Sequence, residues 1–217
     1  MSWSSGKDSA LALEVARREL AFDVVGLLCT VNSDAERVAM HAVRRELLEA
    51  QADRLGIVLH VVDIPFPCPN DVYETRMASA MERAVGDGVG HVVFGDLFLE
   101  DVRAYREQAL EGSGITAVFP LWGRPTDALA REMIDIGIRA VVTCVDPRQA
   151  PAGMAGRSFD ASFLAELPPG ADPCGERGEF HTFVWDAPGF RAPIAVETGE
   201  VVERHGFVFC DVLPAPG

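Results

Sequence analysis

Apolar runs alternate with amphipathic stretches through the first half of the chain, and this alternation is the strongest constraint on its fold. Val24 to Thr30 is a continuous apolar run, which is typical of a strand buried on both faces. The same patterns predict further strands over 57–64 and 91–94, and helices over 9–20, 35–55 and 70–85. Ser33 and Glu36 have the spacing of a capping box before the second helix. Together they predict an α/β fold with a parallel sheet and helices on both of its faces.

The second half of the chain has a different pattern. A helix is expected from Thr126, which would cap it, to about Ile136. The other expected elements are a strand over 139–145, a short helix over 158–167 and hairpin strands near 179–185, 192–197 and 201–211. We place a boundary near residue 122, which separates residues 1–122 from a smaller α+β unit of residues 123–217.

The composition argues against several classes of protein. A net charge of −14 argues against a basic face for DNA or RNA. The five cysteines are far apart and never form a C-x-x-C pair, which argues against a disulfide framework and against a cysteine zinc site. No apolar run approaches the roughly 18 residues that a membrane span needs. We therefore expect a soluble, cytoplasmic protein without a DNA or membrane partner.

The opening stretch "SWSSGKDSALAL" places small and polar residues directly before a helix. Free N–H groups at a helix start bind phosphate, and small side chains let phosphate oxygens approach the backbone. Of the 19 basic residues, Lys7 is the only lysine, which suggests that a compact ammonium suits this position better than a guanidinium. The stretch is not a Walker A loop, because Met1 stands where that loop has its first glycine. The alternative is an ordinary helix N-cap made by a serine or aspartate.

A second stretch, "PCGERGEFHTF", brings Glu176, Glu179 and His181 within six residues of one another. In a strand, Glu179 and His181 would share one face, where a carboxylate beside an imidazole can orient a nucleophile or move a proton. The alternative is a turn at Gly175 and Gly178 that carries solvated charges.

The opening stretch resembles the S-G-G-x-D-S signature of the PP-loop family of ATP pyrophosphatases. Ser5 stands at the first glycine of that signature, a departure that would cost on the order of 1 kcal/mol if its φ is positive. Over nearly its whole length the chain resembles the diphthine–ammonia ligase branch of that family. The stretches that carry this resemblance are "MHAVRRELLEAQADRLGI", "VVFGDLFLEDVRAYRE", "VFPLW" and "CGERGEFHTF".

The resemblance implies a HUP-type, Rossmann-like ATP-binding domain over residues 1–122 and a C-terminal domain over 123–217 that completes the active site. It implies that ATP and Mg²⁺ activate a carboxylate as an acyl adenylate, which ammonia converts to an amide with release of AMP and pyrophosphate. The acceptor would be diphthine on an elongation factor, or another carboxylate if the source is bacterial. The oligomeric state is left open between a monomer and a homodimer.

The resemblance also assigns roles to residues. Catalytic roles fall on Lys7, Asp8, Glu176, Glu179 and His181. Nucleotide-binding roles fall on Ser4, Ser5, Gly6, Lys7, Asp8, Ser9, Thr30, His41, Gly95 and Asp96. Substrate-binding roles fall on Arg103, Arg106, Cys174 and Gly175, and the Mg²⁺ ligands would be Asp8 and Asp96.

Several of these assignments carry a specific expectation. The Lys7 side chain is expected to be exposed, so that its removal changes stability by no more than about 0.5 kcal/mol. His41 is placed in the helix after the second strand, where the alternative is a surface position. Arg103 and Arg106 lie three residues apart and would neutralise a phosphate or a carboxylate, unless they belong to an exposed charged helix. Cys174 is expected to be structural, because amidation needs no thiol.

Two other functions remain open on the sequence. A tRNA-thiolating PP-loop enzyme would need catalytic cysteines and a basic surface, which the scattered cysteines and the net charge of −14 argue against. A regulator that binds an adenine nucleotide without chemistry would share the opening loop, but "CGERGEFH" would then have no role.

Overall fold

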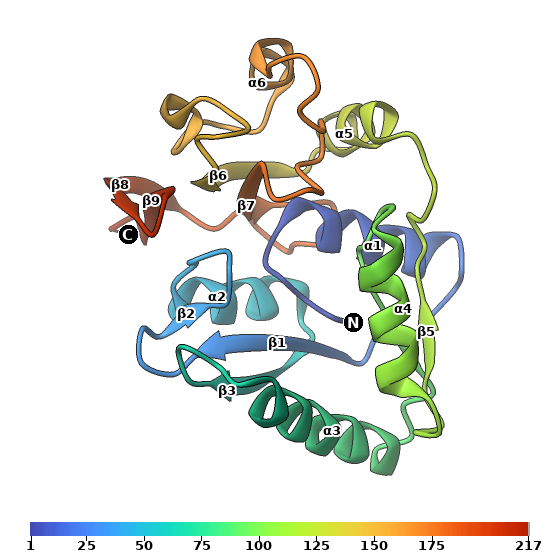
Figure 1. The fold of residues 1–217 in the computed structure, drawn as a ribbon. Coiled ribbons are helices and arrows are strands. Elements are labelled where there is room, and N and C mark those ends of the chain that lie inside the picture. Colours follow the sequence, from blue (N-terminus) through green and yellow to red (C-terminus); the bar gives the residue numbers. More distant parts are fainter. Residues whose placement is uncertain (217) are drawn as a thin grey trace.

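The structure is a computed structural model that describes residues 1–216, and it has a mixed α/β fold (Figure 1). The N-terminal half contains α1 (Lys7–Arg18), β1 (Gly26–Asn32), β2 (Arg37–Val38), α2 (Arg45–Leu55), β3 (Val58–Ile64), α3 (Asn70–Gly86), β4 (His91–Val93), α4 (Glu100–Leu110) and β5 (Thr116–Val118). The C-terminal half contains α5 (Thr126–Asp135), β6 (Arg139–Val145), the 3₁₀ turn η1 (Ala152–Met154), α6 (Ala161–Glu166), β7 (Phe180–Asp186), β8 (Val196–Arg204) and β9 (Phe207–Pro214). None of the helices in this described part has the length and apolarity that a membrane span needs.

The N-terminal half is built on parallel strands. β1 pairs in parallel with β3, and β4 pairs in parallel with β5, while β2 runs antiparallel to the end of β1. The first residues of the chain join these pairs, because the Trp3 N–H donates to the Leu28 carbonyl at 2.8 Å and the Ser2 N–H donates to the Val93 carbonyl at 2.9 Å. Three residues are therefore enough to bridge β1 and β4.

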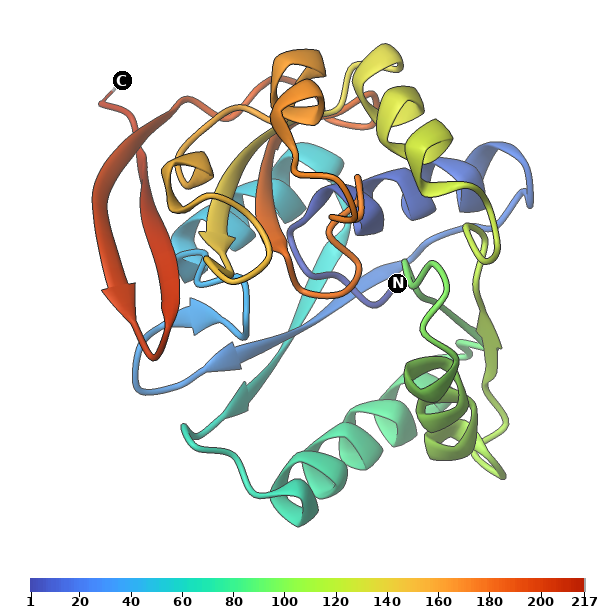
Figure 2. The ribbon, with the colours of Figure 1, turned by 45° about the horizontal axis from the view of Figure 1, so that its top comes forward.

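The C-terminal half adds an antiparallel sheet with the strand order β7-β6-β9-β8. Figures 1 and 2 show α1 and α2 between this sheet and the parallel strands, whereas α3 and α4 lie on the other side of the parallel strands. One apolar core includes Leu11 of α1, Leu48 of α2 and Phe183 of β7. Because this core extends across both halves, the domain boundary near residue 122 stays a prediction.

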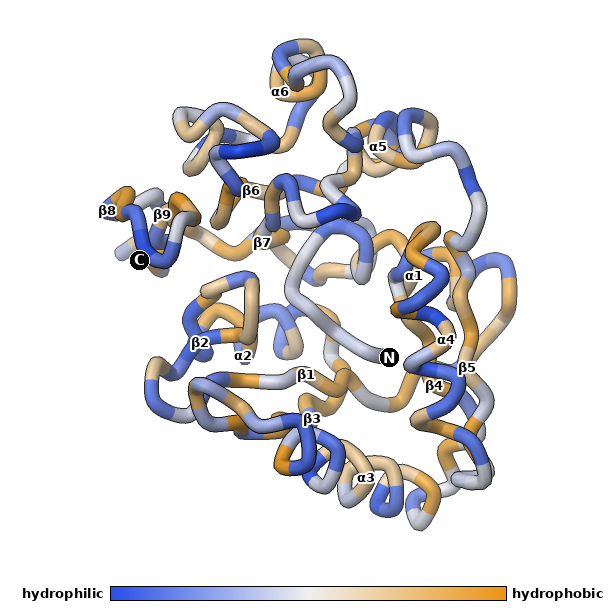
Figure 3. Tube along the Cα trace, in the orientation of Figure 1, coloured by the Kyte–Doolittle hydropathy of each residue, from blue (hydrophilic) through white to orange (hydrophobic). Residues whose placement is uncertain are grey.

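Hydropathy along the chain matches this layering. In Figure 3 the trace along β5 is strongly hydrophobic, and the turn between β8 and β9 is hydrophilic. A second, smaller core joins Ile64 of β3, Met81 of α3 and Leu110 of α4. Burial on both faces explains why β4 and its neighbours read as continuous apolar runs.

The predicted helix over 35–55 is wrong in its first half, since α2 begins only at Arg45. Arg37 and Arg44 each form an ion pair with Asp211 of β9, at 2.8 and 2.7 Å. These contacts hold the intervening residues in a turn, in which Met40 and Ala42 have positive φ values. The predicted capping box is absent as well, because the Ser33 hydroxyl donates to the Ile64 carbonyl instead. A contact distant in sequence overrides the local helical pattern here.

Smaller corrections concern the ends of elements. Thr126 does not cap α5, because its hydroxyl donates to the Asp172 carboxylate at 2.8 Å. The strand predicted over 201–211 is interrupted by a turn at His205 and Gly206, both with positive φ. The strands expected over 57–64 and 139–145 and the helix expected over 70–85 agree with β3, β6 and α3 to within one residue.

Gln51 in α2 joins three parts of the molecule and has no exposed surface (0%). Its Oε1 accepts from the Trp3 indole at 2.8 Å, and its Nε2 donates to the carbonyls of Ser5 and Val184 at 3.0 and 2.6 Å. The side chain therefore connects the parallel strands, the loop before α1 and β7.

We predict that Gln51→Leu lowers the free energy of unfolding by about 3 kcal/mol, because it leaves buried polar partners unsatisfied at about 1–3 kcal/mol each. Urea denaturation monitored by tryptophan fluorescence measures this change. The control is Gln108→Leu at an exposed position of α4, which should change stability by no more than about 0.5 kcal/mol. Equal effects of the two substitutions would contradict the role of Gln51.

Candidate active site

A cavity of about 180 Å³ lies where the start of α1, the end of β4 and the segment before and within β7 meet. Many residues singled out from the sequence line it: Ser4, Lys7, Asp8, Ser9, His41, Gly95, Asp96, Arg106, Cys174, Gly175, Glu176 and His181. Five others do not: Ser5, Gly6, Thr30, Arg103 and Glu179. The fold thus brings the two informative stretches of the sequence to one place, although they are more than 160 residues apart.

The loop before α1 has a left-handed residue. Ser5 has a φ of 68°, a left-handed conformation that glycine adopts more easily than serine. The cost expected for a serine in place of the first glycine of the signature therefore applies. Its side chain is buried, and its hydroxyl has no hydrogen-bond partner among residues 1–216. Gly6 is the N-cap of α1 and provides no side-chain cap, so the alternative of an ordinary serine or aspartate cap is wrong.

The first turn of α1 offers backbone donors to the cavity. The Lys7 N–H donates to the Thr182 hydroxyl at 3.2 Å, but within residues 1–216 the N–H groups of Asp8 and Ser9 donate to no other residue. Gly95 passes close to this turn, where an added Cβ would lie 3.1 Å from the Ser9 nitrogen. Free donors at a helix start and a glycine beside them form an anion-binding arrangement.

The expectation of an exposed Lys7 is wrong, because only 1% of this residue is exposed. Its ammonium donates to both carboxylate oxygens of Asp8, at 3.1 and 2.9 Å, and to the carbonyl of Cys174. The rings of Phe159 and Phe180 lie 5.4 and 5.2 Å from the nitrogen. Burial is the largest single effect on the pKa of Lys7 and lowers it, but the charge and hydrogen bond of Asp8, with other negative groups nearby, together raise the pKa, so the ammonium stays charged.

Arg106 and Arg103 have different positions on α4. Arg106 lines the cavity and pairs with Asp96, with 2.8 Å between Arg106 Nε and an Asp96 oxygen. Arg103 pairs with Glu107 at 2.8 Å and stacks on Phe119 and Trp122, outside the cavity. Arg106 thus lies in the cavity and Arg103 does not, and the substrate-binding role of these arginines stays a prediction.

The two glutamates of the second stretch also differ. Glu176 lines the cavity and accepts a hydrogen bond from the Leu97 N–H at 2.8 Å. Burial raises the pKa of Glu176 to about 7, and the neighbouring charges of Asp8 and Asp96 contribute to this shift. Glu179 is only 1% exposed and accepts from the N–H groups of Asp172 and Arg177, both at 2.9 Å.

Glu179 therefore organises the segment before β7 and does not face the cavity. Because β7 begins at Phe180, the prediction that Glu179 and His181 share a strand face is wrong. The alternative was a turn at Gly175 and Gly178 that carries solvated charges. The turn is present, but the Glu179 carboxylate is buried and accepts two backbone hydrogen bonds, so its charge is not solvated.

His41 and His181 form a pair on the cavity wall, with ring centroids 4.6 Å apart. His41 belongs to the turn before α2, so its predicted position in a helix is wrong. Its Nδ1 lies 3.2 Å from the Thr182 carbonyl, which it reaches as a donor. Burial lowers the pKa of His41 to about 4 and that of His181 to about 3. Both imidazoles are consequently neutral at pH 7.

Thr30 and Cys174 are two further residues with a specific expectation from the sequence. Thr30 lies inside β1, which continues to Asn32, so the prediction that Thr30 ends this strand is wrong. The Cys174 thiol donates to the Thr126 carbonyl at 3.3 Å, and burial raises its pKa, which disfavours a nucleophilic thiolate. Within residues 1–216 there is no group of three or more His, Cys, Asp or Glu residues arranged to hold a metal ion.

Sequence reasoning missed three residues that position the site: Gln51, Asp172 and Thr182. Gln51 carries a signal that could have identified it, because it stands one helical turn after Leu47 and Leu48 on the buried face of α2. A polar residue on such a face needs buried partners. Asp172 has no comparable signal, since its loop is irregular.

Two family models match the chain. The diphthamide synthase N-terminal domain matches residues 1–117, and the diphthamide synthase C-terminal domain matches residues 125–213. A human diphthine–ammonia ligase is 31% identical over 149 residues, which cover 65% of this chain and 54% of the human protein. The rat diphthine–ammonia ligase is 29% identical over 153 residues, with the same coverage. The chain thus spans about half the length of the curated relatives it matches.

We predict that Glu176 makes the stability of the protein fall with rising pH. Its pKa is about 7 in the folded state and 4.5 ordinarily, so the folded state binds the proton more tightly. Stability is therefore lost as the pH rises from about 4.5 through about 7. The variant Glu176→Gln lacks this loss and should gain on the order of 1–2 kcal/mol over the wild type between pH 5 and pH 8, after allowance for solvent screening.

Urea denaturation of both proteins at the two pH values measures this difference. Glu74→Gln, at an exposed position of α3, removes the same charge without burial and is the control. Parallel pH profiles for the wild type and Glu176→Gln would show that Glu176 does not take up a proton on folding.

Proposed function

The chain belongs to the diphthamide synthase family, and we propose that it is an ATP-dependent ligase that converts a carboxylate to an amide with ammonia. One observation carries the proposal: the loop before α1 and the segment around Glu176 line the same cavity. The name of the curated relatives, diphthine–ammonia ligase, supports diphthine as the acceptor. We further propose that residues 1–122 form the ATP-binding domain, that residues 123–217 complete the site, and that the reaction takes place in the cytoplasm.

We also propose that the parallel strands form one HUP-type sheet. The hydrogen bonds of Ser2 and Trp3 to β4 and β1 support it, since they make the first three residues the strand between these two. In such a sheet, ligands bind at the carboxyl ends of the strands. Gly95 and Asp96 follow the end of β4, and they line the cavity.

The phosphate end of the cavity would be the first turn of α1. Ser4, Asp8 and Ser9 line the cavity here, and the hydroxyl oxygens of Ser4 and Ser9 lie 3.2 Å apart. Small donors and a helix start suit the β and γ phosphates of ATP. Arg106 would supply the positive charge on the opposite wall.

Mg²⁺ fits this cavity only together with the phosphates. Three carboxylates and two basic groups line it: Asp8, Asp96, Glu176, Lys7 and Arg106. Such a cavity would repel a bare triphosphate, and Mg²⁺ commonly binds one or two carboxylates plus substrate phosphates. Asp8 and Asp96 would hold the ion, which would neutralise the pyrophosphate as it leaves.

The other end of the cavity would handle the acyl group. A carboxylate oxygen of the acceptor attacks the α-phosphorus of ATP, and the bond to the pyrophosphate oxygen breaks. The nitrogen of ammonia then forms a bond to the acyl carbon, AMP departs with the former carboxylate oxygen, and the nitrogen loses a proton. Glu176, with its pKa of about 7, would accept that proton, and the neutral His41 and His181 would exclude water beside it.

The two alternative functions, tRNA thiolation and nucleotide-dependent regulation, fit the cavity less well than amide ligation does. Thiolation of tRNA would need a reactive cysteine, whereas burial raises the pKa of the one thiol that lines the cavity, Cys174. A regulator would need no raised carboxyl pKa at its binding site. The Glu176 segment favours an enzyme over a regulator.

We predict that the protein forms AMP and pyrophosphate in equal amounts when given ATP, Mg²⁺, ammonium chloride and an elongation factor that carries diphthine. Mass spectrometry of the acceptor should show the conversion of a carboxylate to an amide. Unchanged ATP under these conditions would contradict the proposed function.

The arginines of α4 offer a matched pair for this assay. Arg106→Gln should raise the KM for ATP by at least about tenfold, because a charge-assisted contact to phosphate is lost. Arg103→Gln removes the same charge outside the cavity and should leave the KM within about threefold of the wild type. Equal effects would show that Arg106 does not contact the nucleotide.

A further inference from the structure

We infer that Lys7 is a positioning residue, which fastens the segment 172–179 to the start of α1, and that it is not a ligand of the phosphates. This inference rests on the proposed function only in placing the phosphates at the same helix start. It replaces the nucleotide-binding role that the sequence analysis gave to Lys7, the only lysine of the chain.

The ammonium of Lys7 is enclosed by groups of the protein itself. In this structure it donates to the carboxylate of Asp8, whose two oxygens lie 3.1 and 2.9 Å away, and to the carbonyl oxygen of Cys174. The rings of Phe159 and Phe180 lie beside the nitrogen and, with these acceptors, leave it almost without exposed surface.

Cys174, whose carbonyl accepts from Lys7, belongs to the C-terminal half. Its segment is held there by hydrogen bonds to other residues of the same half. The Cys174 N–H donates to Asp172 at 2.8 Å, and the Asp172 N–H donates to Glu179 at 2.9 Å. Thr126 of α5 donates to the same Asp172 carboxylate. These contacts all lie within the C-terminal half, so they cannot set the distance between Glu176 and the helix start.

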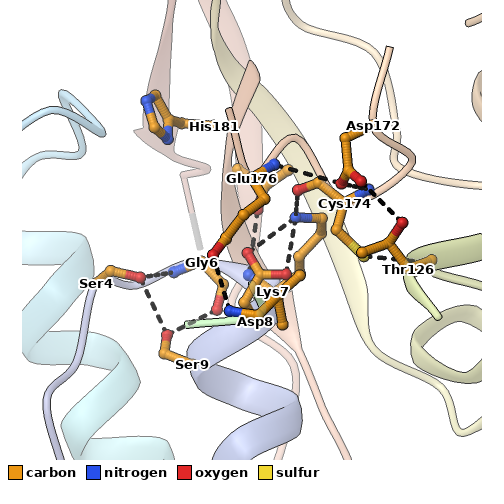
Figure 4. Close-up of polar contacts among 12 residues, drawn as sticks. Ser4, Gly6, Lys7, Asp8, Ser9, Thr126, Asp172, Cys174, Glu176 and His181 are labelled. Atoms are coloured by element: carbon orange, nitrogen blue, oxygen red, sulfur yellow. Dashed lines mark hydrogen bonds and ion pairs between the residues drawn. The ribbon is translucent and has the colours of Figure 1, made fainter. Parts of the chain in front are cut away.

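Lys7 and Glu176 each form a hydrogen bond between the N-terminal half and the C-terminal half. Figure 4 shows the ammonium of Lys7 between Asp8 and the Cys174 carbonyl, with Glu176 two residues further along the chain. The Glu176 carboxylate accepts from the Leu97 N–H in the N-terminal half. Lys7 therefore fixes the backbone at Cys174, and that backbone carries the carboxylate that would act on ammonia.

The choice of lysine over arginine agrees with this role. The chain otherwise uses arginine as its basic residue, and the other basic group of the cavity is Arg106. A planar guanidinium binds phosphate in a bidentate manner, whereas a compact ammonium can serve one carboxylate and one carbonyl between two rings. The contacts of Lys7 are of the second kind.

The lone lysine allows a direct test on the wild-type protein. Lysine labelled with ¹⁵N at the side-chain nitrogen and ¹³C-labelled cysteine should give a single ammonium signal with a coupling across the hydrogen bond to the Cys174 carbonyl. When Mg²⁺ and inorganic pyrophosphate are added, the backbone amide signals of Asp8 and Ser9 should shift, while the Lys7 signal keeps its coupling. Loss of that coupling as the amides shift would overturn the inference.

The variant Lys7→Met tests, without any ligand, whether Lys7 holds the segment 172–179 in place. In Lys7→Met, backbone amides of residues 172–178 should exchange hydrogen at least about tenfold faster than in the wild type, while those of β4 stay unchanged. Ser9→Ala is the matched control in the same helical turn, and it should leave exchange in 172–178 unchanged. Unchanged exchange in Lys7→Met would overturn the inference. If Lys7→Met does not fold, the coupling in the wild type decides the question alone.

Kinetics separates positioning from binding. Lys7→Met should lower kcat for AMP formation at least about tenfold and keep the KM for ATP within about threefold, whereas Ser9→Ala should mainly raise that KM. A KM raised about a hundredfold in Lys7→Met would identify Lys7 as a phosphate ligand and overturn the inference. If pyrophosphate shifts no amide of Asp8 or Ser9, the proposed function fails, and hydrogen exchange in Lys7→Met still decides the role of Lys7.

Discussion

The left-handed backbone at Ser5 is the constraint on which the candidate site depends. A non-glycine residue in this region is strained by about 1–3 kcal/mol and persists only where its surroundings hold it. The Ser5 carbonyl is held from two sides, by the Gln51 amide at 3.0 Å and by the Val184 N–H at 3.0 Å. One of these donors belongs to α2 and the other to β7, so the loop takes its shape only when both halves are packed together. Asp8 and Ser9, which follow this loop at the start of α1, line the cavity.

The fold was predictable where local pattern and tertiary environment agree. After Arg139, β6 is a largely apolar run that only Thr143 interrupts, and it lies buried within its sheet, so the sequence alone predicts residues 139–145. The turn before α2 was not predictable, because it depends on ion pairs of Arg37 and Arg44 with Asp211, which is more than 160 residues away along the chain. The helical pattern of apolar residues depends only on residues close in sequence, so it cannot reveal an ion pair with a distant residue such as Asp211. The hairpin of β8 and β9 was misplaced as well, since its turn needs a positive φ at His205, which residues other than glycine adopt uncommonly.

The candidate site was predictable as a set of residues but not as a set of roles. Glu176 and Glu179 stand three residues apart in the same glycine-containing stretch, and nothing local distinguishes them. In the structure one carboxylate faces the cavity and the other is enclosed by backbone N–H groups. The arginines of α4 show the same separation, because they stand only three residues apart, yet Arg106 lines the cavity and Arg103 stacks on aromatic rings outside it. Roles depend on which way a side chain points, and that is settled by packing.

The electrostatics of the cavity follow from the same packing. A buried ion pair is costly unless further hydrogen bonds satisfy it, and the Cys174 carbonyl supplies such a bond to the pair of Lys7 and Asp8. The positive charge of Lys7 in turn adds to the burial that keeps His41 and His181 neutral. Glu176 is partly buried near the charges of Asp8 and Asp96, and its pKa of about 7 places the loss of its proton near neutral pH. The buried pair of Lys7 and Asp8 and a carboxyl group that can exchange a proton near neutral pH thus line one cavity, as the proposed amidation would require.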